Sequence, residues 1–350
     1  MAKVVTLKKN EDRRITNGHL WAFSNEIQKI SGEPLAGDIV ELRTHAGTLL
    51  GIGFYNPHSL IAVRLLTRQE EEIDFRFFSG RIEAALALRR KIFPNSEAYR
   101  LVHGESDLLP GLVVDKYNDQ LAIQTFSYGM DKRLTLICDV LESIFHPRGI
   151  VERNDVPARS LEGLEQRKGI LRGASSPVTV LEYGVKYGVD LLEGQKTGFF
   201  FDQRDNRRAI RRYAKGMRVL DCFCNEGGFA LNAAHAGASE VIGIDSSERA
   251  VAQAAGNAVL NNLEAQTSFR TSDCFDYLKE AATKGEKFDL IVLDPPSFAK
   301  SKKLVRRAKK GYKELHAYAF RLLKAEGILA TASCSHHVFE DVFLEIIHES

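Results

Sequence analysis

Three short apolar runs in the C-terminal half of the chain each end at an aspartate. They are residues 218–220 before Asp221, residues 240–244 before Asp245 and residues 288–293 before Asp294. Segments of helical length separate them, and this alternation is typical of buried parallel strands in a βαβ sheet. Ligands of such sheets bind at the carboxyl ends of the strands. The pattern therefore predicts an α/β domain with its ligand site beside the three aspartates.

The loop after the first run indicates the class of ligand. It reads Cys222-Phe-Cys-Asn-Glu-Gly-Gly228, in which Gly227 lets the backbone approach a ligand closely. It lacks the G-x-G-x-x-G glycines that cradle a pyrophosphate, and its glutamate would repel one. A nucleoside without phosphates, such as S-adenosylmethionine, fits better. We assign Asp221 or the adjacent backbone to the charged amino acid end of this cofactor, Asp245 to its ribose and Asp273 to its adenine edge. A Rossmann-like domain with incidental acids is the alternative.

The N-terminal part of the chain has a different pattern, with strand-like runs over residues 38–43, 48–55 and 60–66 and turn residues between them. This predicts a small β domain over residues 1–72. One interpretation is a small barrel that presents Arg13, Arg14, His19 and Trp21 to RNA. The other places Trp21 and Phe23 in the core, which we favour for these aromatic residues.

Residues 73–198 are expected to form a linking helix and a middle α+β domain. The helix spans residues 73–93, and its apolar side is formed by Phe77, Ile82, Ala85, Leu86 and Leu88. Hairpins are predicted over residues 112–126 and 178–192, with a helix over 131–144 and a strand over 149–153 between them. No catalytic motif is evident in this domain.

A glycine-flanked loop, Gly194-Gln-Lys-Thr-Gly198, leads into Phe199-Phe-Phe-Asp-Gln203 and an arginine-rich helix. We interpret it as a loop laid over the cofactor, with Phe199 against adenine and with Lys196 and Gln203 on the same side. A plain interdomain linker is the alternative. The cofactor domain is expected to span residues 199–350.

The segment Asp294-Pro295-Pro296-Ser-Phe298 directly follows the fourth predicted strand of this domain. Its prolines fix the backbone and remove N–H donors, so carbonyl oxygens face outward. The Asp294 carboxylate and such a carbonyl can hold an exocyclic amino group, and Phe298 offers a stacking face. This predicts a site for adenine, guanine or cytosine, and by itself it fits N-methylation as well as C-methylation.

Cys334 lies at the carboxyl end of the fifth predicted strand, beside the same pocket. C5 of cytosine is a poor nucleophile, and addition of a thiolate to C6 enables C5 to accept a methyl group. Asp294, near N3 of the base, would share a proton and stabilise the adduct. His336 and His337 are close enough in sequence to favour the thiolate. The alternative is a small buried cysteine on a strand; we favour the nucleophile.

Eight basic residues occupy the fourteen positions from Lys300 to Lys313, with no acid among them. Because this run adjoins the Asp-Pro-Pro loop, we expect phosphate contacts rather than only a solvated face. The residues assigned to these contacts are Lys302, Lys303, Arg306 and Arg307. Arginines of the helix over residues 204–215 would extend the basic track, namely Arg204, Arg207, Arg208, Arg211 and Arg212.

The composition is that of a soluble globular protein of two or three domains, with 350 residues, 44% hydrophobic and 27% charged. A net charge of +2 means that a polyanion would be bound by local basic patches. The five scattered cysteines indicate thiols in a reducing cytoplasm, and their spacing predicts no metal site. No apolar run reaches the roughly 20 residues of a membrane span, and the N-terminus lacks a signal-peptide core.

The chain resembles the class I S-adenosylmethionine-dependent methyltransferases of large-subunit ribosomal RNA that make 5-methylcytosine. The motifs that carry the resemblance are Gly18-His-Leu-Trp, Gly194-Gln-Lys-Thr-Gly-Phe-Phe, Asp202-Gln-Arg, Gly227-Gly-Phe, Asp294-Pro-Pro-Ser-Phe, Gly311-Tyr-Lys and Ser333-Cys-Ser. The resemblance implies an N-terminal PUA-like RNA-binding barrel, a middle α/β domain and a C-terminal Rossmann-like methyltransferase domain. It also implies Cys334 as nucleophile, Asp294 as the acid that holds the base, and Asp221, Asp245 and Asp273 around the cofactor.

Two other functions stay open at this point. One is N-methylation of guanine or adenine in RNA. Related enzymes with a similar Asp-Pro-Pro-[Ser/Thr]-Phe segment methylate guanine nitrogen, and Ser297 with Lys300-Ser-Lys is closer to that pattern. A non-catalytic RNA-binding assembly factor is a hypothesis of another class. The expected partner is large-subunit ribosomal RNA, a homodimer is compatible with the sequence, and the expected location is the cytoplasm. Family members continue for a further antiparallel strand pair, so we expect the last strands of the sheet to be missing here.

Overall fold

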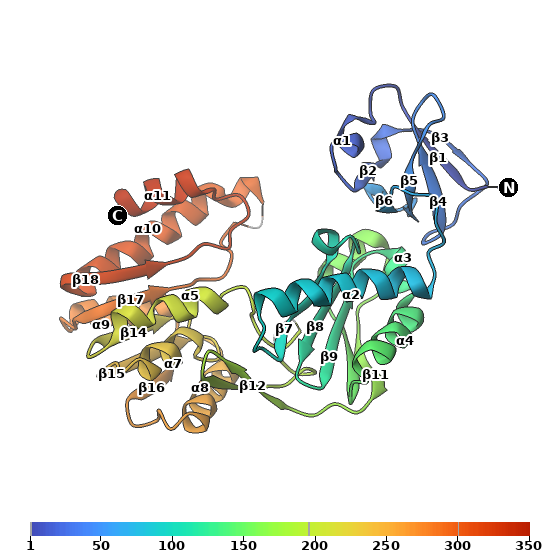
Figure 1. Cartoon of the computed structure of the whole chain (residues 1–350). Coiled ribbons are helices and arrows are strands. Elements are labelled where there is room, and N and C mark those ends of the chain that lie inside the picture. The colour runs from blue at the N-terminus through green and yellow to red at the C-terminus, as the bar shows by residue number, and fades with distance from the viewer. Residues whose placement is uncertain (1, 195–196, 300) are drawn as a thin grey trace. The chain divides into compact units, whose positions relative to one another are not determined.

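The computed structural model describes residues 2–194, 197–299 and 301–350. The chain divides into two compact units (Figure 1). The first comprises Met1–Val180 and Val189–Phe201, and the second comprises Leu181–Gly188 and Asp202–Ser350. The domain boundaries after residues 72 and 198 stay predictions. Among the described residues, no helix combines the length and the apolar content that crossing a membrane requires.

The first unit begins with a six-stranded sheet in the order β2-β6-β5-β4-β1-β3. Its strands are β1 (Val4–Leu7), β2 (Trp21–Phe23), β3 (Ile27–Ser31), β4 (Ile39–Arg43), β5 (Leu49–Tyr55) and β6 (Ile61–Thr67), and α1 (Arg13–Thr16) follows β1. The three predicted strands are confirmed as β4, β5 and β6. The others were not predicted because β1 and β2 are short, and because β3 is mostly exposed and does not alternate between apolar and polar positions.

The prediction that Trp21 and Phe23 belong to the core is wrong. Successive side chains of a strand point to opposite faces, and in β2 it is Ala22 that is fully buried. The indole Nε1 of Trp21 instead donates to Glu105 Oε1 at 2.8 Å. The Arg14 guanidinium lies over the Phe23 ring at 4.7 Å. Both aromatic side chains are half-buried on the outer face of the strand.

The middle of the chain forms a second sheet, in the order β11-β10-β9-β8-β7. Its strands are β7 (Ala98–His103), β8 (Leu112–Tyr117), β9 (Gln120–Thr125), β10 (Gly149–Asn154) and β11 (Arg167–Gly173). Helices α2 (Phe75–Ile92) and α4 (Leu134–Phe145) contribute to the core of this sheet, and the short α3 (Tyr128–Asp131) precedes α4. Of the predicted apolar side of α2, Leu88 is wrong, because it is 47% exposed.

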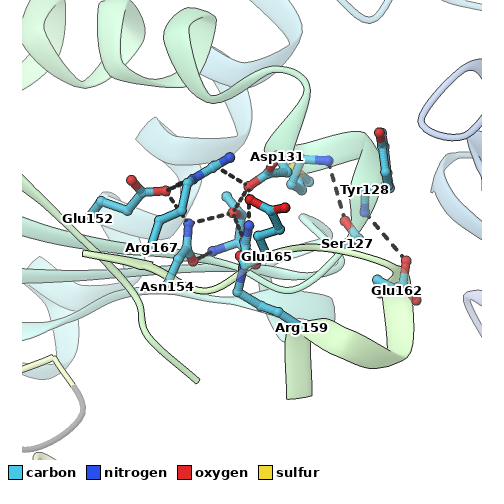
Figure 2. A network of polar contacts seen from close by, with 11 residues as sticks. Ser127, Tyr128, Asp131, Glu152, Asn154, Arg159, Glu162, Glu165 and Arg167 are labelled. Atoms are coloured by element: carbon cyan, nitrogen blue, oxygen red, sulfur yellow. Dashed lines mark hydrogen bonds and ion pairs between the residues drawn. The ribbon is translucent and has the colours of Figure 1, made fainter. Parts of the chain in front are cut away.

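A buried polar network fixes the segment after β10 (Figure 2). Arg159, in η3 (Pro157–Glu162), is fully buried, and its guanidinium donates to Asp131 Oδ1 at 2.9 Å and to Thr125 Oγ1 at 2.8 Å. At the end of η3, Glu162 accepts hydrogen bonds from Asn56, Ser59 and Arg64 in the N-terminal sheet region. A buried charge is costly unless it is paired and hydrogen-bonded, so Glu162 must keep these partners. Its hydrogen bonds therefore link the two sheets of the first unit.

The second unit contains a five-stranded parallel sheet in the order β16-β15-β14-β17-β18 (Figure 1). The strands are β14 (Arg218–Cys222), β15 (Glu240–Asp245), β16 (Thr267–Thr271), β17 (Phe288–Leu293) and β18 (Leu323–Thr331). The connecting helices are α7 (Gly228–His235), α8 (Glu248–Leu260), α9 (Cys274–Thr283) and α10 (Val305–Leu322). The predicted Rossmann-like arrangement is confirmed, and the strand order reverses between β14 and β17, where ligands of such folds bind.

Alternation along β14 shows how the two faces of this sheet are covered. Leu220 and Cys222 belong to a core that includes Leu278 of α9 and Leu315 of α10. Asp221 points to the opposite face, where its carboxylate accepts a hydrogen bond from the backbone N–H of Ala230 in α7. Helices therefore cover both faces of the parallel sheet, as burial of its strands requires.

Two of the arginines assigned to the basic track have a structural role instead. The hairpin of β12 (Val178–Glu182) and β13 (Val185–Val189) is followed by α5 (Arg204–Ala209) and α6 (Arg211–Ala214). Arg204 and Arg207 are buried and pair with Glu182, at 3.2 and 2.8 Å. The prediction that they extend a phosphate-binding track is wrong, because their guanidinium groups are held inside the second unit.

Replacing Glu182 by glutamine is expected to lower the free energy of unfolding by about 3–5 kcal/mol, because two buried guanidinium groups lose the carboxylate that they share. Glu240→Gln is the matched control, since Glu240 is 51% exposed in its pair with Arg218. Loss of such an exposed pair costs about 1 kcal/mol or less. Urea unfolding of both variants measures the difference. Equal losses of stability would show that the buried pair contributes no more than a surface pair.

Candidate functional site

Gly227 shapes the loop between β14 and α7. It has a left-handed backbone conformation, with φ of 81°, and caps the N-terminus of α7. A Cβ atom at this position would come within 3.2 Å of Ala254 Cβ and 3.3 Å of the Phe269 ring. Only glycine fits both constraints without strain. The loop therefore packs closely against α8 and β16, and the approach of its backbone to a ligand stays a prediction.

The Asp221 side chain lies inside the protein and does not reach the open loop after β14. The side chain is fully buried, and Oδ2 accepts the Ala230 N–H at 2.8 Å. Burial raises the pKa of its carboxyl group to about 8, although the hydrogen bond from Ala230 acts in the opposite direction. Oδ1 has no hydrogen-bond partner among the described residues. Of the two predicted alternatives, contact through the adjacent backbone suits this burial better, and the contact itself stays a prediction.

Asp245 and Asp273 lie at the ends of the next two strands of the sheet. The Asp245 carboxylate accepts from the backbone N–H groups of Asn225 and Ser247, each at 2.9 Å. Asp273 caps α9 by accepting from the Phe275 N–H at 2.8 Å. Both carboxylates thus fix the loops around the strand ends, and their assigned contacts with ribose and adenine stay predictions.

Asp294 and Gln203 are brought together by the fold. Gln203 Nε2 donates to Asp294 Oδ2 at 3.0 Å, which joins the start of α5 to the end of β17. Both residues lie in the wall of a cavity of about 470 Å³ that also includes Asn206 and Thr331. The sequence assigned Gln203 to the cofactor and Asp294 to the base, so their hydrogen bond was not predicted. A larger cavity of about 540 Å³, in the first unit, includes Arg76 and Glu71 and none of the residues assigned to either ligand.

The Asp-Pro-Pro-Ser-Phe loop is fastened to the loop that follows β18. Ser335, which is buried, accepts hydrogen bonds at its Oγ from the backbone N–H groups of Phe298 at 3.0 Å and Ala299 at 3.3 Å. The Phe298 ring packs on Tyr312, with ring centroids 4.8 Å apart. Pro295 is buried, whereas Pro296 is exposed. Phe298 is half-buried, and its role as a stacking face for a base stays a prediction.

Cys334 differs from the other cysteines in being exposed, whereas Cys138, Cys222, Cys224 and Cys274 are buried. Its Sγ lies 3.6 Å from the carbonyl oxygen of Pro295. The fold therefore places this thiol beside the peptide that follows Asp294, because β17 and β18 are neighbouring parallel strands. The prediction of a buried strand cysteine, the alternative interpretation, is wrong for Cys334.

The basic run after the Asp-Pro-Pro loop forms η4 (Lys302–Leu304) and the start of α10. Lys303, Arg306, Arg307 and Lys310 are exposed, so they are available to phosphate groups. Two other members pair with acids of α11 (Glu340–His348) and its C-terminal flank instead: Lys309 with Glu345 at 3.0 Å and Lys313 with Glu349. Lys300 and the side chain of Lys302 lie outside the described residues.

The loop that was predicted to cover the cofactor, with Lys196 and Phe199, belongs to the first unit and contacts other residues of that unit. Lys196 lies outside the described residues. Phe199 is buried, and its backbone N–H donates to the Tyr117 hydroxyl at 3.0 Å. Thr197 donates to Asp115 at 2.5 Å. The contribution of β8 to this loop was missed because an aspartate and a tyrosine on a strand carry no motif; the role of Phe199 toward adenine stays a prediction.

Arg13 and Arg14, the N-terminal residues assigned to RNA, are exposed on α1. Arg14 pairs with Glu26 at 2.6 Å, which leaves Arg13 as the less constrained of the two. Contact of either residue with RNA stays a prediction.

Comparisons with known proteins match this geometry. Residues 5–68 match a family of PUA-like domains, and residues 214–349 match a methyltransferase domain family. The ribosomal RNA large subunit methyltransferase I of Tolumonas auensis is 42% identical over all of this chain and 90% of its own length, and that of Aeromonas salmonicida is 40% identical with the same coverage. The chain belongs to the ribosomal RNA large subunit methyltransferase I family. The predicted PUA-like and methyltransferase domains are thereby confirmed.

Solved structures agree at the level of the fold. The methyltransferase SMU.776 in complex with SAH superposes with a TM-score of 0.84 at 22% identity, covering all of this chain and 90% of that one. A methyltransferase from Streptococcus mutans, described as dependent on S-adenosylmethionine, gives a TM-score of 0.81 at 21% identity with the same coverage. As predicted, this family member is an enzyme whose cofactor is S-adenosylmethionine.

The residues at the strand ends fit that cofactor. Asp245 and Asp273 lie at the ends of neighbouring strands, and their carboxylates can accept hydrogen bonds from the hydroxyl and amino groups of a nucleoside. The buried Asp221 Oδ1 is a polar atom that a ligand group beside it would satisfy. When bound, the cofactor supplies an electrophilic methyl group.

Proposed function

We propose that this family member methylates C5 of cytosine in large-subunit ribosomal RNA through a covalent bond between Cys334 and C6. The observation that carries the proposal is the exposed Cys334 thiol, 3.6 Å from the Pro295 carbonyl oxygen and next in space to the loop of Asp294. Methylation of an exocyclic or ring nitrogen needs no covalent thiol, because the nitrogen itself attacks the methyl group once a base or hydrogen-bond acceptor takes its proton. Attack by C5 requires such a nucleophile.

In the proposed mechanism, Cys334 is the nucleophile and Asp294 exchanges a proton with the base. The Cys334 thiolate adds to C6, and N3 takes a proton from the Asp294 carboxyl group, so that C5 gains enamine character. C5 then accepts the methyl group that the bound cofactor supplies, and N3 returns its proton to the Asp294 carboxylate as the C4–N3 double bond re-forms. A base removes the C5 proton, the electron pair of that C–H bond restores the C5–C6 double bond, and the thiolate leaves. Atoms and charges balance without a metal or an oxidant.

Recognition of RNA would use charge outside this pocket. Lys303, Arg306 and Arg307 are exposed beside the Asp-Pro-Pro loop and suit phosphate contacts. In the PUA-like domain, Arg13 and Arg14 suit the same role. The target base would be flipped out if it is stacked or paired. Ribosomal RNA is thus the proposed substrate, and the proposed location is the cytoplasm; a homodimer stays a prediction.

Nucleoside mass spectrometry tests the proposal. The protein is incubated with methyl-labelled S-adenosylmethionine and unmodified large-subunit ribosomal RNA, and the RNA is then digested. Labelled 5-methylcytidine is the expected product. Labelled methylguanosine or methyladenosine would overturn the cytosine-C5 assignment and leave a methyltransferase of ring or amino nitrogen.

The second candidate, N-methylation of guanine, rests on the Gln203–Asp294 hydrogen bond. An amide beside a carboxylate can read the donor and acceptor edge of guanine, and Ser297 follows the prolines as in enzymes of that type. This candidate predicts that Cys334→Ala keeps most activity. The third, a non-catalytic RNA-binding factor, predicts that no RNA is labelled, whereas the RNA is still bound.

A further inference from the structure

Tyr312 of α10 lies at the centre of the hydrogen bonds around Cys334. Its side chain is fully buried, and its Oη lies 2.9 Å from Ser333 Oγ and 3.1 Å from Ser335 Oγ. These two serines are the immediate neighbours of Cys334 in the chain. The Tyr312 ring is held by Phe298 and Phe343, with centroids 4.8 and 5.3 Å away.

The number of donors and acceptors on each group gives the direction of the hydrogen bonds between Ser335, Tyr312 and Ser333. Ser335 Oγ already accepts two backbone N–H groups, from Phe298 and Ala299, which occupy both of its lone pairs. Its own proton is therefore donated to Tyr312 Oη. The Tyr312 proton is in turn donated to Ser333 Oγ, which also accepts the Ser335 N–H at 3.3 Å. The result is one directed chain of hydrogen bonds.

This chain joins two parts of the site that are far apart in sequence. One end holds the backbone of the Asp294–Ala299 loop at Phe298 and Ala299, and the other holds Ser333 on the N-terminal side of Cys334. In addition, Cys334 Sγ lies against Pro295 of the same loop. Ser335 and Cys334 thus link the thiol segment directly to the Asp-Pro-Pro loop, and the Tyr312 hydroxyl adds the link between Ser335 and Ser333 on the two sides of the thiol.

We propose that Tyr312 is a positioning residue that sets where the Cys334 thiol stands relative to Asp294 and the base. The proposal rests on the proposed function, because it assumes that Cys334 attacks C6. Tyr312 itself touches neither substrate nor cofactor in this role. A displacement of the attacking atom by about 1 Å can lower a rate about 10²-fold, so a lost tether has a measurable effect.

The surroundings keep the hydroxyl in the protonated form that the chain requires. Burial raises the pKa of Tyr312, so the phenol keeps its proton through the neutral range. The adjacent His316 has a pKa lowered by burial to about 4 and stays neutral there. Its Nε2 lies 3.0 Å from Thr331 Oγ1, at the end of β18. Both neighbouring groups are therefore uncharged at the pH of an activity assay.

Tyr312→Phe removes the hydroxyl and keeps the ring in its packing. The matched control is Tyr318→Phe, on the same helix, whose half-buried ring packs against the neighbouring core. Three properties are measured for each variant: kcat, KM for RNA, and the rate at which iodoacetamide alkylates Cys334 in the folded protein. Because the other four cysteines are buried, alkylation of the native protein reports on Cys334.

For Tyr312→Phe we expect kcat to fall about 10- to 100-fold, with KM nearly unchanged. We also expect the alkylation rate to change, whereas Tyr318→Phe resembles the parent protein in all three measurements. Equal kcat values and alkylation rates for the two variants would overturn the proposal. The parent and Cys334→Ala are assayed alongside: an active Cys334→Ala overturns the proposed function and with it this one, whereas an inactive Cys334→Ala with an unaffected Tyr312→Phe overturns only the role of Tyr312.

If Tyr312→Phe melts at a much lower temperature than the parent protein, the Ser335→Ala and Ser333→Ala variants are used to test the hydrogen-bond chain instead. Ser335→Ala removes the link to the Asp-Pro-Pro loop, and Ser333→Ala removes the last acceptor of the chain. Slowed alkylation or turnover in both variants, with less than additive effects in the double variant, supports one connected chain. Parent-like rates in both overturn it.

Discussion

Cys334→Ala is expected to lower kcat for methylation of cytosine at least about 10³-fold, because without a bond at C6 the C5 atom is too weak a nucleophile. Binding of S-adenosylmethionine should be unchanged, since Asp221, Asp245 and Asp273 lie at other strand ends. Initial rates of methyl transfer to ribosomal RNA, together with calorimetric titration of the cofactor, measure both quantities. Cys334→Ser is the matched control for size, and it should be as impaired as alanine because an alcohol is not ionised at neutral pH.

A trapping experiment checks the same prediction without relying on turnover. RNA that carries 5-fluorocytosine at the target lacks the C5 proton whose removal releases the enzyme, so the Cys334–C6 bond should persist. The parent protein is expected to form a complex that survives denaturing electrophoresis, and Cys334→Ala is expected to form none. A Cys334→Ala variant that retains most activity would contradict the mechanism and favour methylation at nitrogen.

The strand-end aspartates could be predicted because their signal is local. Asp221, Asp245 and Asp294 each follow a buried run, and the register of a parallel sheet brings such ends to one edge. Helix α2 was equally evident from its apolar side, and the structure adds Asp74 as its N-cap. Features that depend only on a residue and its neighbours in sequence could therefore be predicted from the sequence alone.

The remaining features depend on pairs that meet only in the folded chain. Tyr312 reaches Ser335 because α10 packs beside the loop after β18, and neither residue type signals this in sequence. Arg207 was predicted to be a surface charge, but in the folded chain it is buried and paired with Glu182. Trp21 was misjudged because a strand of three residues gives too little alternation to tell its two faces apart.

Asp294→Asn is expected to lower kcat about 10²- to 10³-fold, because the negative charge beside N3 is lost while the side chain keeps its size. The oxygen of asparagine can still accept the hydrogen bond that Gln203 Nε2 now donates to Asp294 at 3.0 Å, so the link between α5 and β17 is preserved. Rates of methyl transfer and of adduct formation with 5-fluorocytosine RNA should both fall. The loss therefore reports on charge rather than on packing.

Gln203→Ala separates the two contributions. It removes the hydrogen bond and leaves the carboxylate, so we expect a loss of about tenfold or less, which corresponds to one hydrogen bond of about 1 kcal/mol. If Gln203→Ala were the more damaging variant, the amide would be the group that reads the base, and Asp294 would serve to hold it. If Asp294→Asn kept full activity, the carboxylate would have no part in proton sharing at N3, and the backbone carbonyl of Pro295 would be left as the acceptor for the exocyclic amine.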